Sequence, residues 1–490
     1  MSTKKNFLYN FSYQLLIIII PLITTPYVAR VIGAKGVGIQ SYTYSIANYF
    51  VLFTMLGVNN HGNRSIAMVR EDKEKLSKTF WSIYSLKAIM GILMMSIYII
   101  YIIFIVKENK IIALIQSIYI IGALLDINWF FFGMEQFKLT VIRNTIIKIM
   151  SACSIFIFVK NSEDLYLYSL ILACGILISQ IILWRFLFKH ISFVRITIQD
   201  IVSQIKPNLI LFIPVIAISI YKIMDKIMIG SMSSMIQVGF YENSEKIISI
   251  PLGVITALGA VMLPKMSNLQ SKGLEDESKK YIEISMQFVM FISIGAVFGL
   301  IGVSPVLIPI FLGNEFNNCI TLVSYLSITL LFLSWANVIR TQYLIPKKRD
   351  KIYITSTILG AIVNLIINAL LISKYGAGGA IVGTIFAEAT VCIYQTIMVR
   401  KELDIKKYFV NNVFYIIPGV IMCLIIRFIG YIFNNSSIFI GVIEIIIGCG
   451  VYLVLSLIYI IATKNEIWIN EFKKLTKKFN KSKMVNLQGE

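Results

Sequence analysis

Long apolar runs alternate with short polar segments from one end of the 490-residue chain to the other. Each run holds about twenty residues, the length that an α-helix needs to cross the roughly 30 Å hydrocarbon layer of a bilayer. Transmembrane β-barrels need short segments of alternating hydrophobicity instead, and the sequence shows no sustained alternation. The pattern predicts an all-α polytopic membrane protein with about fourteen spans. They cover approximately residues 11–32, 38–60, 80–106, 111–133, 144–159, 165–188, 208–231, 247–263, 284–304, 319–345, 352–373, 376–398, 410–430 and 438–463.

The composition agrees with a membrane protein. Hydrophobic residues make up 57% of the chain and charged residues only 14%, with a mean hydropathy of +0.80. A soluble protein carries about 25% charged residues. The first apolar run lacks a small-residue cleavage site and is too long for a signal-peptide core, so we expect it to remain as a span. The six cysteines lie almost entirely in apolar runs and show neither metal-ligand spacing nor a disulfide framework.

The net charge of +20 reflects membrane topology rather than a nucleic-acid partner. With the N-terminus placed in the cytoplasm, the loops on that side hold about 32 Lys and Arg, and the opposite loops hold about six. This asymmetry predicts that both termini are cytoplasmic. The basic C-terminal tail follows the same rule, either as a solvated topology signal or as a contact for anionic lipids.

The connections between the spans are too short to hold a folded domain. The longest are near residues 61–79, 189–207 and 264–283. This argues against a membrane-anchored enzyme, and also against a polysaccharide polymerase, which would present a large outer loop. The sequence contains no nucleophile elbow, phosphate-binding Walker loop or metal motif. We therefore predict no catalytic residue, metal site or cofactor, and expect any energy input to come from H⁺ or Na⁺ or from use of the product outside.

Two glycine-containing turns suggest an internal repeat. RVIGAKGVGIQSY at 30–42 is echoed by KIMIG at 226–230 and VGFYENS at 238–244, at an offset of about six spans. A parallel repeat of six helices implies two lobes related by an axis along the membrane normal, as in many transporters. A chance similarity of two glycine-rich turns is the alternative explanation.

The sequence also resembles a known family along nearly its whole length. TPYVARVIGAKGVGIQSYTYSIANYF, LLDINWFFFGMEQFKLTVIRN, SIYKIMDKIMIG with VGFYENSEKI, and NLIINALLISKYGAGGAIVGTIFAEAT follow one another at the spacing typical of Wzx-type polysaccharide repeat-unit flippases. These belong to the multidrug/oligosaccharidyl-lipid/polysaccharide exporter superfamily. The resemblance implies an N-lobe over 1–203 (spans 1–6), a C-lobe over 204–400 (spans 7–12), and spans 13–14 with the basic cytoplasmic tail over 401–490.

The resemblance further implies the activity and the cellular location. It implies a multi-pass protein of the bacterial cytoplasmic membrane, and not an enzyme, that moves undecaprenyl-pyrophosphate-linked oligosaccharide repeat units from the inner to the outer leaflet for capsule assembly. Membrane lipids, a polysaccharide polymerase and glycosyltransferases are the further partners it suggests. A teichoic acid precursor flippase and a drug/cation antiporter of the same superfamily are the alternatives, although an antiporter should favour acidic rather than basic residues in its cavity.

Three charged residues interrupt the apolar stretch SIYKIMDKIMIG at 219–230. Lys222 lies only about 4–5 Å from the middle of its span, and Asp225 and Lys226 follow at spacings that can share a helix face. An ion facing lipid there costs about 2.5–3.5 kcal/mol. We therefore predict that Lys222 and Lys226 face a water-filled cavity and bind the pyrophosphate, while Asp225 orients them. A purely structural Lys222–Asp225 pair is the alternative.

Three further charged residues are candidates for the transport pathway. Arg30, near the outer end of the first span, is placed opposite Lys226 by the repeat and is a second candidate cation for the substrate. Glu388 lies almost at the centre of its span, and Asp126 slightly toward the inner side. Both are candidates for cavity or coupling-ion roles, with interhelical hydrogen bonding as the structural alternative.

Overall fold

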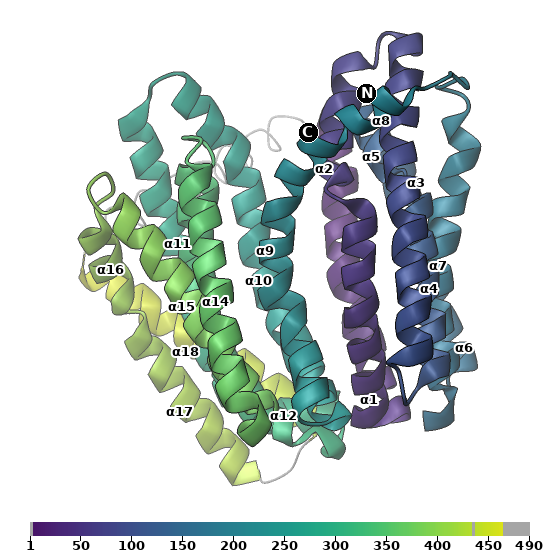
Figure 1. The fold of residues 1–490 in the computed structure, drawn as a ribbon. Helices are drawn as coiled ribbons and strands as arrows, with labels where there is room; N and C mark the ends of the chain where they lie inside the picture. Colours follow the sequence, from purple (N-terminus) through teal and green to yellow (C-terminus); the bar gives the residue numbers. More distant parts are fainter. Residues whose placement is uncertain (1–2, 434–436, 464–490) are drawn as a thin grey trace, which may run out of the picture. The chain divides into compact units, whose positions relative to one another are not determined.

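The computed structural model describes residues 3–433 and 437–463, and these are helical almost throughout, without any strand in those ranges (Figure 1). The predicted basic tail lies outside the described residues. The helices in the first part are α1 (Thr3–Met55), α2 (Val58–Val69), α3 (Lys73–Phe104), α4 (Lys110–Leu125), α5 (Asn128–Gly133), α6 (Phe137–Phe158), η1 (Ser162–Asp164), α7 (Leu165–Leu187), α8 (Ile198–Ser203) and α9 (Ile205–Met232). They are followed by α10 (Met235–Ser271), α11 (Glu275–Phe311), η2 (Asn314–Phe316), α12 (Asn318–Ser327), α13 (Thr329–Ile339), η3 (Arg340–Leu344), α14 (Asp350–Tyr375), α15 (Ala377–Val399), α16 (Ile405–Val413), α17 (Ile416–Phe433) and α18 (Ile438–Ala462).

The number of membrane-spanning helices agrees with the sequence pattern. Within the described ranges, eleven helical stretches are long and apolar enough to cross a membrane. A twelfth span consists of Ile198–Ile213 and Val215–Met232, which meet at a bend of 42°. Helix α1 is broken at Gly33 and so supplies two apolar segments. The predicted all-α membrane fold with about fourteen spans is therefore confirmed.

The chain forms two compact units. Unit 1 consists of Met1–Ile247, Phe311–Leu322 and Thr357–Ala387, and unit 2 of Ile248–Ile310, Val323–Ser356 and Glu388–Glu490. The predicted lobes, with boundaries near residues 203 and 400, rest on the sequence repeat instead and stay a prediction.

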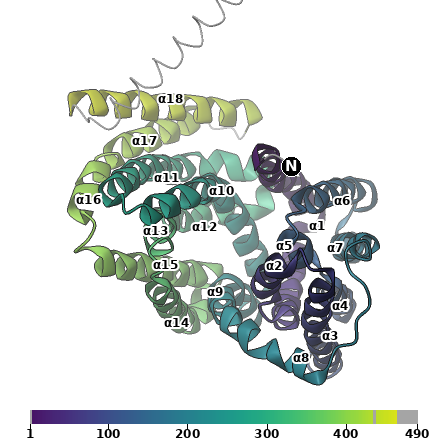
Figure 2. The ribbon, with the colours of Figure 1, turned by 90° about the horizontal axis from the view of Figure 1, so that it is seen from above.

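In unit 1, helix α1 packs along α3, α4, α6 and α7 (Figure 2). A cluster of aromatic rings fills the space near one end of these helices, where the Phe80 and Trp129 ring centroids lie 5.4 Å apart in a stacked arrangement. Phe130 packs edge-on against Phe80, also with 5.4 Å between the centroids. All three side chains are completely buried, so this cluster holds α3 against the short helix α5.

Hydrogen bonds between side chains join three helices in the interior of unit 1. Gln116 of α4 donates through Nε2 to Gln40 Oε1 of α1 at 2.9 Å and to Thr43 Oγ1 at 3.2 Å. Ser169 of α7 donates to the same Gln40 oxygen. Because lipid offers no alternative partner, such bonds fix the relative rotation of neighbouring helices.

Unit 2 has its own apolar core, centred on α11 and α13. Completely buried side chains such as Met286 and Ile339 form this core. Ser293 donates to Ser334 at 2.5 Å, and Trp335 Nε1 donates to Thr396 Oγ1 at 3.0 Å. Helices α17 and α18 pack side by side (Figure 2), and Tyr452 of α18 donates to the carbonyl of Phe291 at 2.7 Å.

Glycine is required where α1 breaks. Gly33 has φ 72° and ψ 173°, a backbone conformation that is essentially restricted to glycine. The break frees the next amide, and Ala34 N donates to Glu315 Oε1 at 3.0 Å. A Cβ on residue 33 would lie 3.0 Å from the other oxygen of Glu315. Backbone strain and crowding thus both exclude a side chain here.

We expect Gly33→Ala to destabilise the protein by about 1–3 kcal/mol, because alanine must adopt this strained conformation beside Glu315. The measurement is the apparent melting temperature of the purified chain in detergent. Gly378→Ala is the matched control, since a Cβ there meets no atom within 4 Å. Equal melting temperatures for the two variants would contradict the assigned role of Gly33.

Candidate functional site

The three charged residues predicted on span 7 lie on α9, in unit 1, but in different surroundings. Lys222 is exposed, Asp225 is completely buried, and Lys226 is largely buried with 16% of its side chain exposed. Within the described residues, Asp225 forms no ion pair with either lysine, and Lys222 forms none at all. The structure therefore separates these three residues into distinct environments.

Asp225 is held by hydrogen bonds from three other helices. Tyr241 of α10 donates its hydroxyl to Oδ2 at 2.7 Å, and Thr384 of α15 donates to the same oxygen at 2.8 Å. Asn368 of α14 donates through Nδ2 to Oδ1 at 2.6 Å and to Asn364 Oδ1 at 3.1 Å. One carboxylate thus joins four helices of unit 1.

The surroundings of Asp225 suit a proton or a small cation. A buried carboxylate is costly unless its charge is compensated. Its neighbours offer hydroxyl and carboxamide oxygens, and the Asn368 Oδ1 oxygen is buried without a hydrogen-bond partner. Hard cations prefer such oxygen ligands. No group of three or more His, Cys, Asp or Glu within the described ranges could hold a metal ion, so a site here would depend on neutral oxygens around one carboxylate.

Lys226 lies in a separate ionic cluster. Its Nζ contacts Glu242 at 2.7 Å and Glu245 at 2.8 Å, both on α10. Lys246, one turn along α10, contacts Glu242 at 3.2 Å, and Ser41 of α1 donates to Glu242 at 2.7 Å. We call Lys226, Glu242, Glu245 and Lys246 the ionic cluster. Its two ammonium groups and two carboxylates balance in charge, so Lys226 is neutralised in this conformation.

Sequence reasoning missed most of the ionic cluster and of the Asp225 network. The sequence pattern marked YENSEKI at 241–247 only through the internal repeat and the family resemblance. Its own spacing contained a signal, because Glu245 and Lys246 follow Glu242 by about one helical turn and so lie on the same side of the helix. Tyr241 and Thr384 carry no charge in an apolar sequence, so no comparable signal marked them as partners of Asp225.

The other predicted residues lie elsewhere. Arg30 is exposed and its side chain lies beside Gly313, where a Cβ would be 3.5 Å from Arg30 Cγ. Asp126 is half-buried at the end of α4 and lines a cavity of about 290 Å³. Glu388 belongs to unit 2 and is 6% exposed. The roles predicted for these residues stay predictions.

Comparison with known proteins identifies the family. The family model described as "Polysaccharide biosynthesis protein" matches residues 3–270, more than half of the chain. The chain therefore belongs to this family of multi-pass membrane proteins. The resemblance to polysaccharide repeat-unit flippases noted in the sequence is confirmed at this level.

Two curated relatives match over nearly their whole length. The "Putative O-antigen transporter" of Shigella dysenteriae is 25% identical over 396 residues, which cover 80% of this chain and 98% of that protein. The protein of the same name from Escherichia coli (strain K12) is 23% identical over 408 residues, or 82% and 98% of the two chains. Both are named as transporters and not as enzymes, in agreement with the sequence prediction.

A solved structure shares the fold. It is the "Lipid II flippase MurJ, inward closed conformation", with a TM-score of 0.73 and 18% identity, and the match covers 94% of this chain and 100% of that one. At this identity the likeness concerns the fold alone.

We expect Lys226→Met to destabilise the protein by about 3–5 kcal/mol, because it leaves Glu242 and Glu245 together without their shared cation. The double variant Lys226→Met/Glu245→Gln should recover much of the loss, since it leaves one carboxylate, Glu242, paired with Lys246. Apparent melting temperatures in detergent measure both effects. If the double variant is no more stable than the single one, charge pairing does not stabilise this site.

Proposed function

We propose that this protein is a flippase for lipid-linked oligosaccharides. The observation that carries the proposal is the match over 98% of the length of two proteins named as O-antigen transporters. The chain also shares its fold with a protein named as a lipid II flippase. In the finer proposal, the substrates are undecaprenyl-pyrophosphate-linked repeat units, carried from the inner to the outer leaflet of the bacterial cytoplasmic membrane.

The same proposal includes the orientation and the pathway. The excess of Lys and Arg in alternate loops supports cytoplasmic termini. The exported units would be consumed in the assembly of capsule or another surface polysaccharide, after glycosyltransferases build them and before a polymerase joins them. Teichoic acid assembly remains the alternative pathway for the same reaction.

The ionic cluster is the proposed contact for the pyrophosphate. A lysine ammonium binds phosphate oxygens as a mobile point charge. In the described conformation Lys226 forms ion pairs with Glu242 and Glu245, so a pyrophosphate must displace their carboxylates. When the pyrophosphate is released, the carboxylates would pair with Lys226 again. This competition would limit how tightly the substrate is held. Exposed Lys222 and Arg30 are the proposed additional cationic contacts.

Asp225 is the proposed coupling site for H⁺ or Na⁺. The sequence suggested Glu388 and Asp126 for this role, and their participation stays a proposal. Asp225 is favoured because it is completely buried, is surrounded by neutral oxygen-bearing side chains, and forms no ion pair within the described residues. Binding of a proton or a sodium ion would neutralise its charge without a basic side chain.

A drug/cation antiporter is the competing function. Such a protein needs uncompensated acidic groups to attract an organic cation. The carboxylates of the ionic cluster are matched by Lys226 and Lys246, and Asp225, which forms no ion pair within the described residues, is completely buried, which argues against this reading. Accumulation of an organic cation in cells that lack the chain, with normal surface polysaccharide, would favour the antiporter.

Deletion of the chain tests the flippase proposal directly. We expect undecaprenyl-linked repeat units to accumulate on the inner leaflet, because translocation is the step that is lost. Mass spectrometry of extracted lipids, combined with a membrane-impermeant glycan-modifying probe, measures their amount and leaflet. A polymerase mutant, which still exports single units, is the control. Normal export of the units by the deletion strain would refute the proposal.

Substitution of Asp225 tests the coupling site. We expect Asp225→Asn, which cannot exchange a proton or carry a charge, to abolish the dependence of flipping on the cation gradient and to slow it by about tenfold or more. Flipping in vesicles is measured with a Na⁺ gradient at constant pH and with a pH gradient at constant Na⁺. Asp164→Asn, at the start of α7, is the control. Retained ion dependence in Asp225→Asn would rule out this site.

A further inference from the structure

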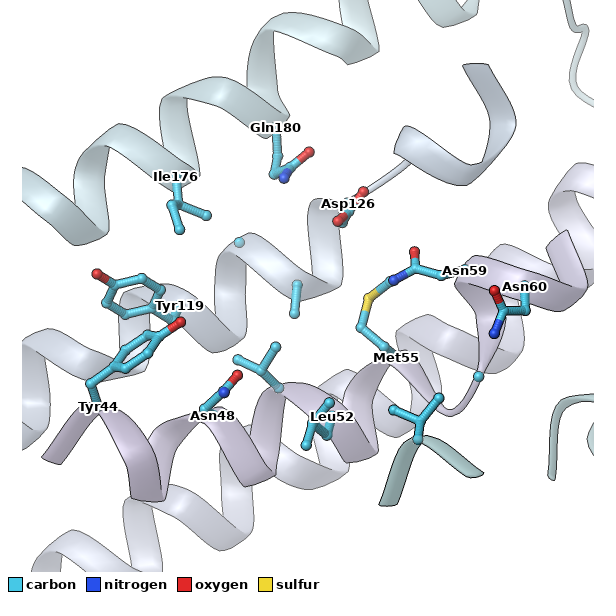
Figure 3. A pocket seen from close by; sticks show the side chains of 15 residues that line it. Tyr44, Asn48, Leu52, Met55, Asn59, Asn60, Tyr119, Asp126, Ile176 and Gln180 are labelled. Carbon is cyan, nitrogen blue, oxygen red and sulfur yellow. The ribbon is translucent and has the colours of Figure 1, made fainter. Parts of the chain in front are cut away.

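Unit 1 contains a cavity of about 290 Å³ whose wall combines apolar side chains with several polar groups (Figure 3). It is formed by the second half of α1, the start of α2, and parts of α4, α7 and α9. The uncharged hydrogen-bonding groups that line it belong to Tyr44, Asn48, Asn59, Asn60, Tyr119 and Gln180. Leu52, Met55 and Ile176 are among the apolar side chains of the wall.

The aromatic and amide groups face the same space. The Tyr44 and Tyr119 rings meet edge to face, with 4.9 Å between their centroids. Asn48 lies between these rings and Leu52 along the wall, and Gln180 and Asp126 lie farther along the cavity (Figure 3). Carboxamides both donate and accept hydrogen bonds, as hydroxyl groups do. The lining therefore offers matched partners for a ligand rich in hydroxyl groups, together with apolar ring surfaces.

Breaks in the helices hold these groups in place. Gly57, with φ 78°, forms the turn between α1 and α2, so Asn59 and Asn60 follow directly at the rim of the cavity. At the other break, α4 ends and Asp126 Oδ1 accepts from the Asn128 backbone amide at 2.7 Å. Asn128 in turn donates through Nδ2 to Gln180 Oε1 at 3.1 Å, which leaves the Gln180 amide nitrogen for a ligand.

The charge of the lining favours a neutral ligand. Asp126 is its one ionisable carboxylate, and within the described residues no Lys or Arg lines the cavity. Completely buried Lys87 donates to the backbone carbonyl of Asp126 and interacts electrostatically with its carboxylate. The Lys87 ammonium thus lies near Asp126, behind the wall of the cavity. A phosphate would find no cation in the lining, and the nearby ammonium disfavours an organic cation.

We propose that this cavity binds a sugar ring of the lipid-linked oligosaccharide. The inference rests on the proposed function and adds a saccharide subsite to it, separate from the ionic cluster. A volume of about 290 Å³ lies at the lower end for ligand pockets, which suits one sugar ring rather than a whole repeat unit. Hydroxyl groups bind the carboxamides, and the apolar face of the ring packs against Tyr44 or Tyr119.

Cysteine protection tests the subsite. In a chain whose six cysteines are replaced by alanine, Asn48→Cys introduces a thiol into the cavity and Asn63→Cys places one on the exposed surface of α2. Membrane vesicles receive lipid extract from cells that make the repeat unit, or extract from cells that lack the first glycosyltransferase and therefore hold the lipid carrier without sugar. The rate of maleimide modification is the readout.

We expect the sugar-bearing extract to slow modification of Asn48→Cys at least threefold, while the sugar-free extract and the Asn63→Cys control show no change. Equal rates with both extracts would overturn the subsite, as would an Asn48→Cys thiol that maleimide cannot reach at all. Protection by tetraphenylphosphonium instead of the sugar-bearing extract would also overturn it, because the cavity would then bind organic cations.

Export by matched asparagine variants gives a second readout. Asn60→Ala should slow export of repeat units by about two- to tenfold, the value of one neutral hydrogen bond, and Asn63→Ala on the same helix should not. If the deletion strain accumulates repeat units, but export is unchanged in Asn60→Ala and the Asn48→Cys thiol is not protected, the subsite is refuted and the flippase function stands. Absence of that accumulation refutes the flippase function itself.

Discussion

The hydrocarbon core of a bilayer offers no hydrogen-bond partner, and this constraint shapes the polar positions of the helices. Buried polar groups find partners on another helix, at a break, or on a carbonyl of their own helix. Gln40 Oε1 accepts from both Gln116 and Ser169 and thereby joins three helices. The same requirement brings Tyr241, Asn368 and Thr384 to one carboxylate, so functional groups and helix packing in unit 1 are built from the same contacts.

Where a helix is interrupted, side chains form hydrogen bonds with the backbone amides and carbonyls that lack their helical partners. At Gly33 the freed amide of Ala34 donates to the carboxylate of Glu315. At the end of α4 the carbonyl of Leu125 accepts from Trp184, and that of Asp126 accepts from Lys87 and Trp129. Such substitutes permit irregular backbone at membrane depth. The second of these breaks also presents Asp126 to the cavity, so a structural solution and a candidate binding surface coincide.

A lipid-linked saccharide combines a charged headgroup, neutral hydroxyl groups and an apolar chain. In unit 1 the proposed contacts for the headgroup and for the hydroxyl groups lie in separate places. In the proposed function, an anion must compete with the carboxylates of the ionic cluster for Lys226. The proposed sugar subsite is lined by carboxamides and tyrosines and, within the described residues, by no Lys or Arg. Asp225, the proposed coupling site, forms no ion pair within the described residues. Separation of these three environments would let binding of the headgroup, the sugar and the ion be adjusted independently.

Hydropathy and charge asymmetry along the sequence determined the membrane class, the number of spans and the residues at which charge is placed in apolar helices. These features depend on segment length and on local composition, which a linear pattern contains. The partners of those charges depended on tertiary structure. Asp225 and Lys226 are neighbours in the chain, yet one binds Tyr241, Thr384 and Asn368 and the other binds Glu242 and Glu245. The packing of the other helices around α9 decides which partners each of these side chains meets, because those partners lie up to 159 residues away in the sequence.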